Sequence, residues 1–528
     1  MGAEHVQARI GAYADSVTLM QVSARAQAIA GVRGVLVAMA TELNLGLLDG
    51  LGLRAPAGIS PHDLLVAIKA DDAAALHAAL AVIDEALAHG PGVASGQPGG
   101  PGGPEAAPLT TRSAVARAGR GIALISVPGQ YALAEAMDAL EAGCDVMVFS
   151  DNVPVEHEVA LKEVAARQGR LVMGPDCGTA IVAGLGLGFA NAVRPGPIGL
   201  VAASGTGAQQ VSCLLDVAGA GCGAVLGVGG RDLSAVVGGR SARTALALLD
   251  EDPGTELIML LSKPPDPQVA AGLRRFADML ATPVQFALIG PGQPDLTTAT
   301  ETALAAIGVP VPAWPAWPAW PTWPVRSAFP TPASQARHAL AGGLRGLFAG
   351  GTLCDEAMVI ATGLLGEIYS NRPFAPELRL DALDPLLPVD HRPLTARHAM
   401  IDFGADELTS GRPHPMIDQR LRLDRLDAEA ADPATAVIML DVVLGYGAHP
   451  DPAAELAPAI QAAVAARDSL AVVVALIGTA GDPQGLTAQV TTLAEAGADV
   501  FASNAQAARF ACGLITGTEP ARAHGAAK

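Results

Sequence analysis

The stretches PIGLVAASGTGAQQV (residues 197–211) and LRGLFAGGTLCDEAM (residues 344–358) decide the fold. Each reads as a short apolar strand, a glycine-containing turn and the first turns of a helix. Three later landmarks follow both stretches in the same order: a Gly-Arg pair (Gly239-Arg240 and Gly411-Arg412), an Asp-Pro before an Ile-Met-Leu strand (252–253 and 432–433), and the tetrapeptide ALIG (287–290 and 475–478). Four landmarks in one order predict an internal duplication.

The rest of the chain fits an α/β, multidomain protein with parallel sheets. Strands alternate with helices of about ten residues after residue 112, which is typical of parallel sheets covered by helices. The expected segments are a small N-terminal α/β domain (1–89), a Gly/Pro linker (90–111), an α/β unit with a parallel sheet (112–194), a first doubly wound domain (195–295), a Pro/Trp-rich linker (296–342), a second doubly wound domain (343–515) and a tail (516–528).

Within the N-terminal domain, three apolar runs are expected to be strands, each followed by a helix. They are SVTLMQV (16–22), GVLVAMA (34–40) and DLLVAIK (63–69). This pattern predicts a β-α-β-α-β-α unit without chemistry of its own.

Composition excludes several classes of protein. The net charge is −19 and no Lys/Arg run is present, so a nucleic-acid surface is not expected. Six cysteines without CxxC spacing indicate small buried side chains in a reducing compartment, not a zinc site. No apolar run approaches the ~20 residues of a membrane span, and the N-terminus lacks a signal-peptide core, so we expect a cytoplasmic protein without a membrane partner.

All four tryptophans lie in the segment PVPAWPAWPAWPTWPV (310–325). Polyproline II has three residues per turn, so Trp314, Trp317, Trp320 and Trp323 are predicted to lie along one face. Two interpretations remain open: an aromatic strip that docks on a neighbouring domain or partner, or a stiff spacer whose tryptophans cover local apolar surface.

The two turns are the first candidate site. Ligands of parallel sheets bind at the carboxyl ends of strands, where free N–H groups and the helix dipole attract anions. We expect phosphate to bind at Ser204-Gly205-Thr206-Gly207, before a helix beginning near Ala208, and at Gly350-Gly351-Thr352. The alternative for either turn alone is glycine used for packing. Neither turn carries the lysine of a GxxxxGK[ST] loop, which disfavours an ATP-binding P-loop.

Polar residues near the turns supply further candidates. Arg240 and Arg243 can bind substrate carboxylate or phosphate through their planar guanidinium groups, or can be solvated residues at a helix end. Arg231-Asp232 ends the VLGVGG strand. In the second copy, Asp402, Asp406, Glu407, Arg412, His414 and Asp418 form a dense polar cluster.

Within that cluster, His414 lies between Pro413 and Pro415, which suits an oriented general acid/base or phosphate ligand with Arg412 beside it. A structural histidine is the alternative. The carboxylates also permit a divalent ion, although their spacing specifies no metal. Asp176, which follows a strand, is a candidate for substrate binding, whereas its neighbour Cys177 is expected to be structural.

Several strings resemble a known family. MGPDCGTA (173–180), GPIGLVAASGTGAQQV (196–211) and ELIMLLSKPP (256–265) are similar to the α-subunit of succinyl-CoA synthetase. The whole chain resembles the FdrA family of that superfamily through DSVTLM, LISVPGQYA, FSDNVP, GGTLCDEA and GRPHPMID. The resemblance implies a CoA-binding-like Rossmann domain at 112–194 and two ligase-type flavodoxin-like domains, with paired helix N-termini around a phosphoryl group.

The chain departs from the synthetase at three points. The synthetase's phosphohistidine string is replaced by FALIGPGQPD (286–295), which has no histidine, and both the glycine turn that seats CoA and the ATP-grasp portion are missing. The FdrA family is associated with oxamate carbamoyltransferase, which works with separately encoded partner subunits. That reaction converts oxalurate and phosphate to oxamate and carbamoyl phosphate, in allantoin degradation, without phosphohistidine or CoA.

The resemblance therefore implies an FdrA-type subunit of a phosphate-dependent carbamoyl or acyl transferase, acting on a small carboxylate or acyl phosphate. Two alternatives stay open: a succinyl-CoA ligase-like acyl-CoA synthetase subunit, and a scaffold that has lost catalysis. No cofactor is certain, phosphate or carbamoyl phosphate is the expected substrate, and CoA and a homo-oligomer are left open.

Overall fold

The computed structural model describes residues 2–10, 12, 14, 16–56, 58–61, 63–89, 108, 110–317, 339–380, 397–409 and 413–518. These residues form two compact units, one built from the chain up to Gly119 and one from almost all of the remainder. None of the described helices combines the length and the apolar character that crossing a membrane requires.

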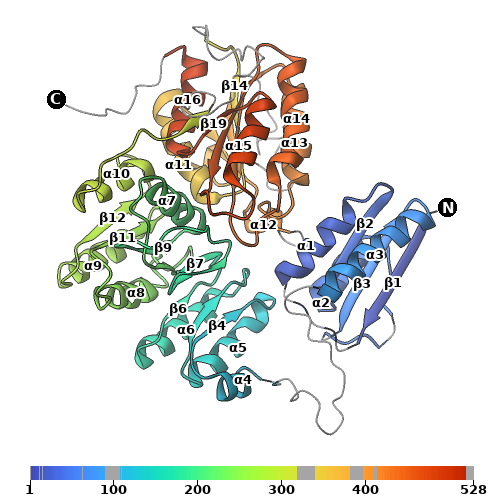
Figure 1. Ribbon diagram of the computed structural model, residues 1–528, viewed down its shortest axis with the longest axis horizontal. Helices are drawn as coiled ribbons and strands as arrows, with labels where there is room; N and C mark the ends of the chain where they lie inside the picture. Colours follow the sequence, from blue (N-terminus) through green and yellow to red (C-terminus); the bar gives the residue numbers. More distant parts are fainter. Residues whose placement is uncertain are drawn as a thin grey trace. The chain divides into compact units, whose positions relative to one another are not determined.

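The N-terminal unit is a three-stranded antiparallel sheet of order β1-β3-β2 with helices packed on it (Figure 1). Its elements are β1 (Ala3–Arg9), α1 (Ser16–Gln27), β2 (Val32–Met39), α2 (Glu42–Gly50), β3 (Leu64–Ala70), α3 (Ala73–His89) and α4 (Thr111–Ala118).

The strand expected at residues 16–22 is wrong, because this run forms helix α1. Its buried residues Leu19, Val22 and Ala26 follow the three- and four-residue spacing of a helix face, and that face packs on the sheet. The first strand is instead β1, which the apolar-run criterion missed because its side chains are only partly buried.

The second unit begins with a small parallel sheet of order β4-β5-β6, covered by two helices. Its elements are β4 (Ile122–Ile125), α5 (Gly129–Glu141), β5 (Asp145–Val148), α6 (Val155–Gln168) and β6 (Val172–Met173). The predicted alternation of strands and helices after residue 112 is confirmed here.

A six-stranded sheet of order β12-β11-β9-β10-β7-β8 follows. Its elements are β7 (Thr179–Val182), β8 (Leu185–Gly188), β9 (Ile198–Ala203), α7 (Gly205–Val217), β10 (Val225–Gly227), α8 (Arg240–Asp250), β11 (Leu257–Ser262), α9 (Pro267–Ala277), β12 (Val284–Leu288) and α10 (Leu296–Ala306).

The last sheet has seven strands, of order β13-β19-β18-β17-β14-β16-β15. Its elements are β13 (Ala316–Trp317), β14 (Gly343–Phe348), α11 (Gly351–Leu365), β15 (Ile368–Tyr369), the 3₁₀ turn η2 (Pro376–Leu378), β16 (His398–Asp402), α12 (Asp406–Thr409), α13 (Arg420–Ala431), β17 (Thr435–Val443), α14 (Pro452–Ala466), β18 (Ala471–Ile477), α15 (Leu486–Glu495), β19 (Asp499–Phe501) and α16 (Asn504–Thr516).

The predicted duplication is visible in the strand order. The first copy contains the parallel order β10-β9-β11-β12, and the second contains the matching order β16-β14-β17-β18. Every residue of β9, β14, β17 and β18 is buried, as expected for strands covered by helices on both faces. The α/β, multidomain fold with two flavodoxin-like copies is therefore confirmed.

The two copies pack through α7 and α10 of the first against α11 and α16 of the second (Figure 1). Buried polar groups cross this contact: Gln210 donates to the carbonyl of Ala502, and the amide N–H of Asn504 donates back to Gln210. The helices that follow the two glycine turns, α7 and α11, are thus direct neighbours.

The segment before residue 318 is shared between the two cores. Trp314 is buried among residues of the first sheet, and its indole donates to Glu301 at 2.7 Å. Trp317 is buried in the core of the second sheet, where β13 pairs with β19. The two tryptophans are therefore buried in different cores. Trp320 and Trp323 lie outside the described residues.

Candidate functional site

The carboxyl ends of the central strands bring the two glycine turns together. Ser204 caps helix α7, where its Oγ accepts from the Gly207 N–H at 2.9 Å. The same hydroxyl donates to Thr352 Oγ1, in the first turn of α11, at 2.6 Å. Helix α7 begins at Gly205, three residues before the expected Ala208. The starts of α7 and α11 are thus joined by a buried hydrogen bond.

Glycine makes this approach possible. A Cβ on Gly350 would lie 2.8 Å from Thr206 Oγ1, and one on Gly207 would lie 2.5 Å from Ser204 Oγ and 3.1 Å from Thr352 Cγ2. Real Cβ atoms do not approach other atoms so closely, so neither position accepts a side chain unless its neighbours shift. Both glycines therefore also have a packing role, because they leave room for the two turns to lie close together.

A buried ion pair holds the second turn in place. The carboxylate of Asp441, after the Ile-Met-Leu run of β17, accepts the N–H groups of Ala349 and Gly350, each at 2.7 Å. Arg422 of α13 donates to the same carboxylate at 2.7 Å and to the Asp441 carbonyl at 2.8 Å. The amides of Ala349 and Gly350 are therefore already occupied.

Other amides of the two turns remain available. Within the described part of the chain, no hydrogen bond engages the N–H groups of Gly205, Thr206, Gly351 or Thr352. These groups belong to the first turns of α7 and α11, where helical geometry leaves the N–H without an acceptor. Each start also carries the positive end of the helix dipole.

Strand register brings charged side chains to the turns. Ser262 pairs with Ala203, so Lys263 follows at the edge where α7 begins. Phe348 pairs with Asp402, which sets that carboxylate beside the start of α11. A Cβ on Gly351 would lie 2.5 Å from Asp402 Oδ2 and 3.0 Å from Lys263 Nζ.

Two ion pairs lie here, one across the two copies and one within the second copy. Lys263 Nζ, from the first copy, lies 3.4 Å from Asp355 Oδ2 of α11. Arg372 Nη1 lies 3.3 Å from Asp402 Oδ2, and 42% of the Arg372 side chain is exposed. Burial raises the pKa of Asp402 to about 6, although the positive charges of Lys263 and Arg372 act in the opposite direction.

Asp176 lies in the loop between β6 and β7. Its backbone has a φ of 56°. Loss of water around the carboxyl raises its pKa to about 7, and the negative charges of Asp406 and Asp151 raise it further, while Lys263 and Arg231 lower it. Asp176 is therefore within electrostatic reach of Lys263.

The described residues hold no group of three or more His, Cys, Asp or Glu side chains placed to bind a metal ion.

His414 is half-buried beside the second turn. Its Nδ1 accepts from the Met416 N–H at 3.2 Å, and its ring packs on Phe189 with centroids 5.8 Å apart. Burial lowers its pKa to about 4, with a contribution from the positive charge of Arg422, so the imidazole is neutral at pH 7. Because Nδ1 accepts, the proton lies on Nε2, which is 2.9 Å from where a Cβ on Gly404 would be. His414 is a neutral hydrogen-bond donor in this arrangement.

The arginine candidates have different surroundings. Arg240, in α8, donates to Glu163 at 3.0 Å and to the carbonyls of Val236 and Val237. The Arg243 guanidinium lies 5.6 Å from the centre of the Phe276 ring. No hydrogen bond or ion pair among the described residues joins either arginine to the two turns. Arg412 lies outside the described residues.

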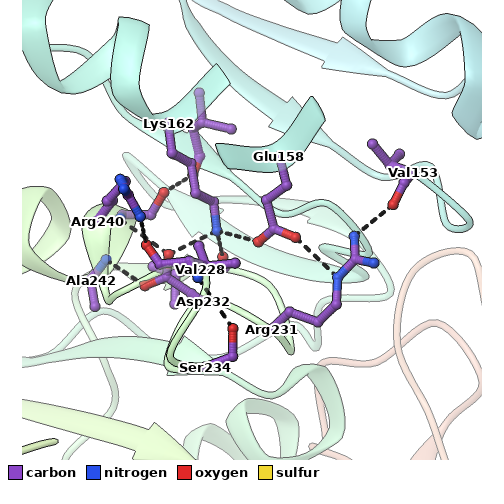
Figure 2. Close-up of polar contacts among 12 residues, drawn as sticks. Val153, Glu158, Lys162, Val228, Arg231, Asp232, Ser234, Arg240 and Ala242 are labelled. Atoms are coloured by element: carbon purple, nitrogen blue, oxygen red, sulfur yellow. Dashed lines mark hydrogen bonds and ion pairs between the residues drawn. The ribbon is translucent and has the colours of Figure 1, made fainter. Parts of the chain in front are cut away.

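Arg231 and Asp232 belong to a buried network that joins the small parallel sheet to the first copy. Figure 2 shows Lys162 of α6 donating to Glu158, Asp232 and the Val228 carbonyl, each at 2.8 Å. Arg231 donates to the other oxygen of Glu158 at 3.0 Å. Every buried charge here has a partner, so the network is structural.

Sequence reasoning missed Lys263, Arg372, Asp441 and Thr179, a buried residue at the start of β7. Lys263 carried a usable signal, because the chain has only four lysines and this one directly follows a predicted strand. Arg372 and Asp441 had none, since their positions depend on how β15, β16 and β17 align with β14. Thr179 stood within the quoted MGPDCGTA string, but only strand pairing sets it near Gly205.

The chain is similar to known proteins along nearly its whole length. The family model described as CoA-ligase matches residues 347–514, and the model described as AllF, heavy metal-associated domain, matches residues 1–100. The uncharacterised protein YahF of Escherichia coli is 38% identical over 504 residues, which cover 93% of this chain and 95% of YahF.

More distant relatives match only part of the chain. A succinate–CoA ligase [ADP-forming] subunit alpha 2 of Archaeoglobus fulgidus is 28% identical over 185 residues, 34% of this chain and 63% of that subunit. The solved structure of a dinucleotide-forming acetyl-coenzyme A synthetase of Ca. Korarchaeum cryptofilum aligns with 75% of this chain and 82% of the synthetase chain. The sequence identity is 17% and the TM-score is 0.28. A likeness this slight supports no argument. The near full-length match shows that the chain belongs to the same family as YahF.

Proposed function

We propose that the chain is a subunit of an acyl-CoA synthetase-like enzyme, and that it holds the phosphoryl group of an acyl phosphate at the joined starts of α7 and α11. The hydrogen bond between Ser204 and Thr352 carries this proposal, because it brings two anion-attracting helix starts to one place. The similarity to CoA ligases supports the acyl-transfer chemistry.

The available donors suit a phosphoryl group. The N–H groups of Gly205, Thr206, Gly351 and Thr352 would bind its oxygens, and Lys263 would balance its charge. When an acceptor attacks the acyl carbon, the bond from that carbon to the phosphate oxygen breaks and its electron pair leaves with the phosphate. Donors that face the leaving phosphate would therefore stabilise the transition state.

Two side chains are placed for proton handling. Asp402, with a pKa of about 6, can take or release a proton near neutral pH. His414 would donate a hydrogen bond from Nε2 instead of acting as a base. Catalytic roles for His414 and Arg412, and substrate binding by Arg240, Arg243 and Asp176, stay predictions.

A second candidate function is carbamoyl transfer by an FdrA-type subunit, from oxalurate and phosphate to oxamate and carbamoyl phosphate. Two observations favour it. The segment 286–295 holds no histidine. His414 accepts a hydrogen bond at Nδ1 and so carries its proton on Nε2, which therefore cannot attack a phosphoryl group. Carbamoyl transfer needs neither a phosphohistidine nor CoA. The relatives named as CoA ligases favour the first candidate.

Titration calorimetry on the full chain tests the proposal with inorganic phosphate, acetyl phosphate, carbamoyl phosphate and CoA. We expect phosphate and an acyl phosphate to bind, and Lys263→Met to weaken both about tenfold because it removes the cation nearest Gly351. Lys69→Met, which removes a half-exposed lysine of the N-terminal unit, is the matched control and should change neither affinity.

The outcomes separate the candidates. Binding of both CoA and acetyl phosphate supports the acyl-CoA synthetase-like function. If carbamoyl phosphate binds and CoA does not, the carbamoyl transferase function is supported in place of the acyl-CoA synthetase-like function. If the wild-type chain binds no phosphate compound, both are wrong.

A further inference from the structure

The four glycines of the two turns differ in the space beside them. A Cβ on Gly207, Gly350 or Gly351 would lie 2.5–2.8 Å from a neighbouring atom, so these positions are filled. Beside Gly205, the first residue of α7, the nearest atom to a Cβ would be Thr179 Oγ1 at 3.8 Å, with nothing else within 4 Å outside the glycine's own chain neighbours and helix backbone. Gly205 thus has free space on the side where the other three are crowded.

The hydroxyl that borders this space lacks a hydrogen bond. Thr179, the first residue of β7, is only 4% exposed, and its Oγ1 is buried without a partner in the described part of the chain. Its carbonyl, by contrast, accepts from the Cys177 thiol. A buried hydroxyl without a partner is unfavourable, and such groups call for a ligand, a water or an ion.

Two independent features therefore meet at one point: the unoccupied N–H groups of the first turn of α7, and a buried hydroxyl that needs an acceptor. Both are donors, and both are neutral. One oxygen of an oxyanion close to the Cα of Gly205 can accept from both groups, as oxyanions do at helix starts.

We infer that Thr179 is a further anion-binding residue, and that its hydroxyl and the Gly205 N–H bind one oxygen of a tetrahedral oxyanion such as the phosphoryl group of an acyl phosphate. This inference rests on the proposed function, because it adds a donor to the same site. It gives the α7 side of the site a donor set of hydroxyl and amide groups, distinct from the charged side chains beside α11.

The test is Thr179→Val, which replaces the hydroxyl by a methyl group of similar size. The ligand-free variant should melt at the wild-type temperature or higher, because an unpaired buried hydroxyl has been removed. Its affinity for inorganic phosphate and acetyl phosphate should fall about tenfold. Thr179→Ser, which keeps the hydroxyl, should bind both with nearly wild-type affinity.

Thr300→Val is the matched control. Thr300 is also fully buried, but its hydroxyl already donates to the Leu296 carbonyl at 2.7 Å. This variant should melt at a lower temperature and bind phosphate unchanged, the opposite of Thr179→Val on both measurements.

Gly205→Ala supplies a second test. The added methyl group fits the free space beside Gly205 without a clash, so the fold should persist, but it occupies the place of the anion's oxygen. Phosphate binding should be lost.

Equal phosphate affinity of wild type and Thr179→Val, or a lower melting temperature of the ligand-free variant with unchanged binding, overturns the inference and leaves the proposed function intact. Absence of phosphate binding by the wild type defeats the proposed function itself.

Discussion

Asp402 is the residue in which the charges of the site converge. Its carboxyl lies beside the start of α11, accepts from the Gly404 N–H at 3.0 Å, and faces Arg372, Lys263 and Asp355. Burial keeps its pKa near 6, so its charge changes within the range in which enzymes are assayed. A phosphate bound at Gly351 would meet either a neutral hydroxyl donor or a negative charge.

Phosphate binding should therefore weaken as the pH rises through about 6. We expect the affinity of the wild type to fall about tenfold relative to Asp402→Asn between pH 5 and pH 8, because only the wild type gains a negative charge there. Calorimetric titration at both pH values measures the difference, with Asp424→Asn, an exposed carboxyl of α13, as control. An identical pH dependence in wild type and Asp402→Asn would contradict this role.

Sequence patterns located these residues only in part. The density of polar groups after residue 401 singled out Asp402 and His414, and the flanking prolines predicted an oriented imidazole. They could not show that the Met416 N–H donates to Nδ1 and leaves the proton on Nε2, because that contact depends on the local turn. Lys263 and Asp402 come together through strand register, which no local pattern encodes.

At the scale of single elements, the start of α11 depends on a carboxylate supplied by another strand. Gly350 has no side chain to cap the helix, and Asp441 of β17 accepts the two preceding amides instead. Helix α7, in contrast, is capped by its own N-cap residue, because the Ser204 hydroxyl accepts from the Gly207 N–H. The two copies therefore reach the same helix geometry by different means.

Asp441→Asn should destabilise the chain by about 3 kcal/mol, because it leaves the Arg422 guanidinium buried without its charge partner. Adding Arg422→Met should restore part of that loss, since no unpaired charge then remains. Urea denaturation of the three proteins measures both effects. If the double variant is less stable than the sum of its single changes predicts, the ion pair does not act as described.

Helices and strands were predicted correctly where the apolar pattern and the flanking glycine turns indicated the same element. The strand, turn and helix at 197–211 and at 344–358 follow the prediction, and so does the alternation after residue 112. It failed for α1, because a short run containing valine, leucine and methionine fits a strand as well as a helix until the spacing of Leu19, Val22 and Ala26 is considered.

At the scale of the second unit, a buried carboxyl joins the two copies. Glu356 of α11 accepts from the Leu296 N–H at the start of α10 and from the side chain of Asn504 at the start of α16, each at 2.7 Å. Burial raises the pKa of Glu356 to about 7, and the negative charge of Asp295 contributes. Contact between the copies is therefore coupled to protonation.

The sign of this coupling can be stated. A carboxyl whose folded-state pKa is raised contributes stability below its ordinary pKa of about 4.5, and that contribution is lost as the pH rises through 7. The wild type should therefore lose about 2 kcal/mol relative to Glu356→Gln between pH 5 and pH 8. Thermal melts at both pH values measure this. A wild type that becomes more stable than the variant as the pH rises would contradict it.

The tryptophans give the duplicated part of the molecule a built-in optical reporter. All four lie between residues 314 and 323, and the two described ones, three residues apart, are buried in different cores. The emission of Trp314 and Trp317 consequently reports on the two cores in which these side chains are buried. Melting of either half alone would expose an indole to water and shift the emission to longer wavelength, even while the other half stays folded.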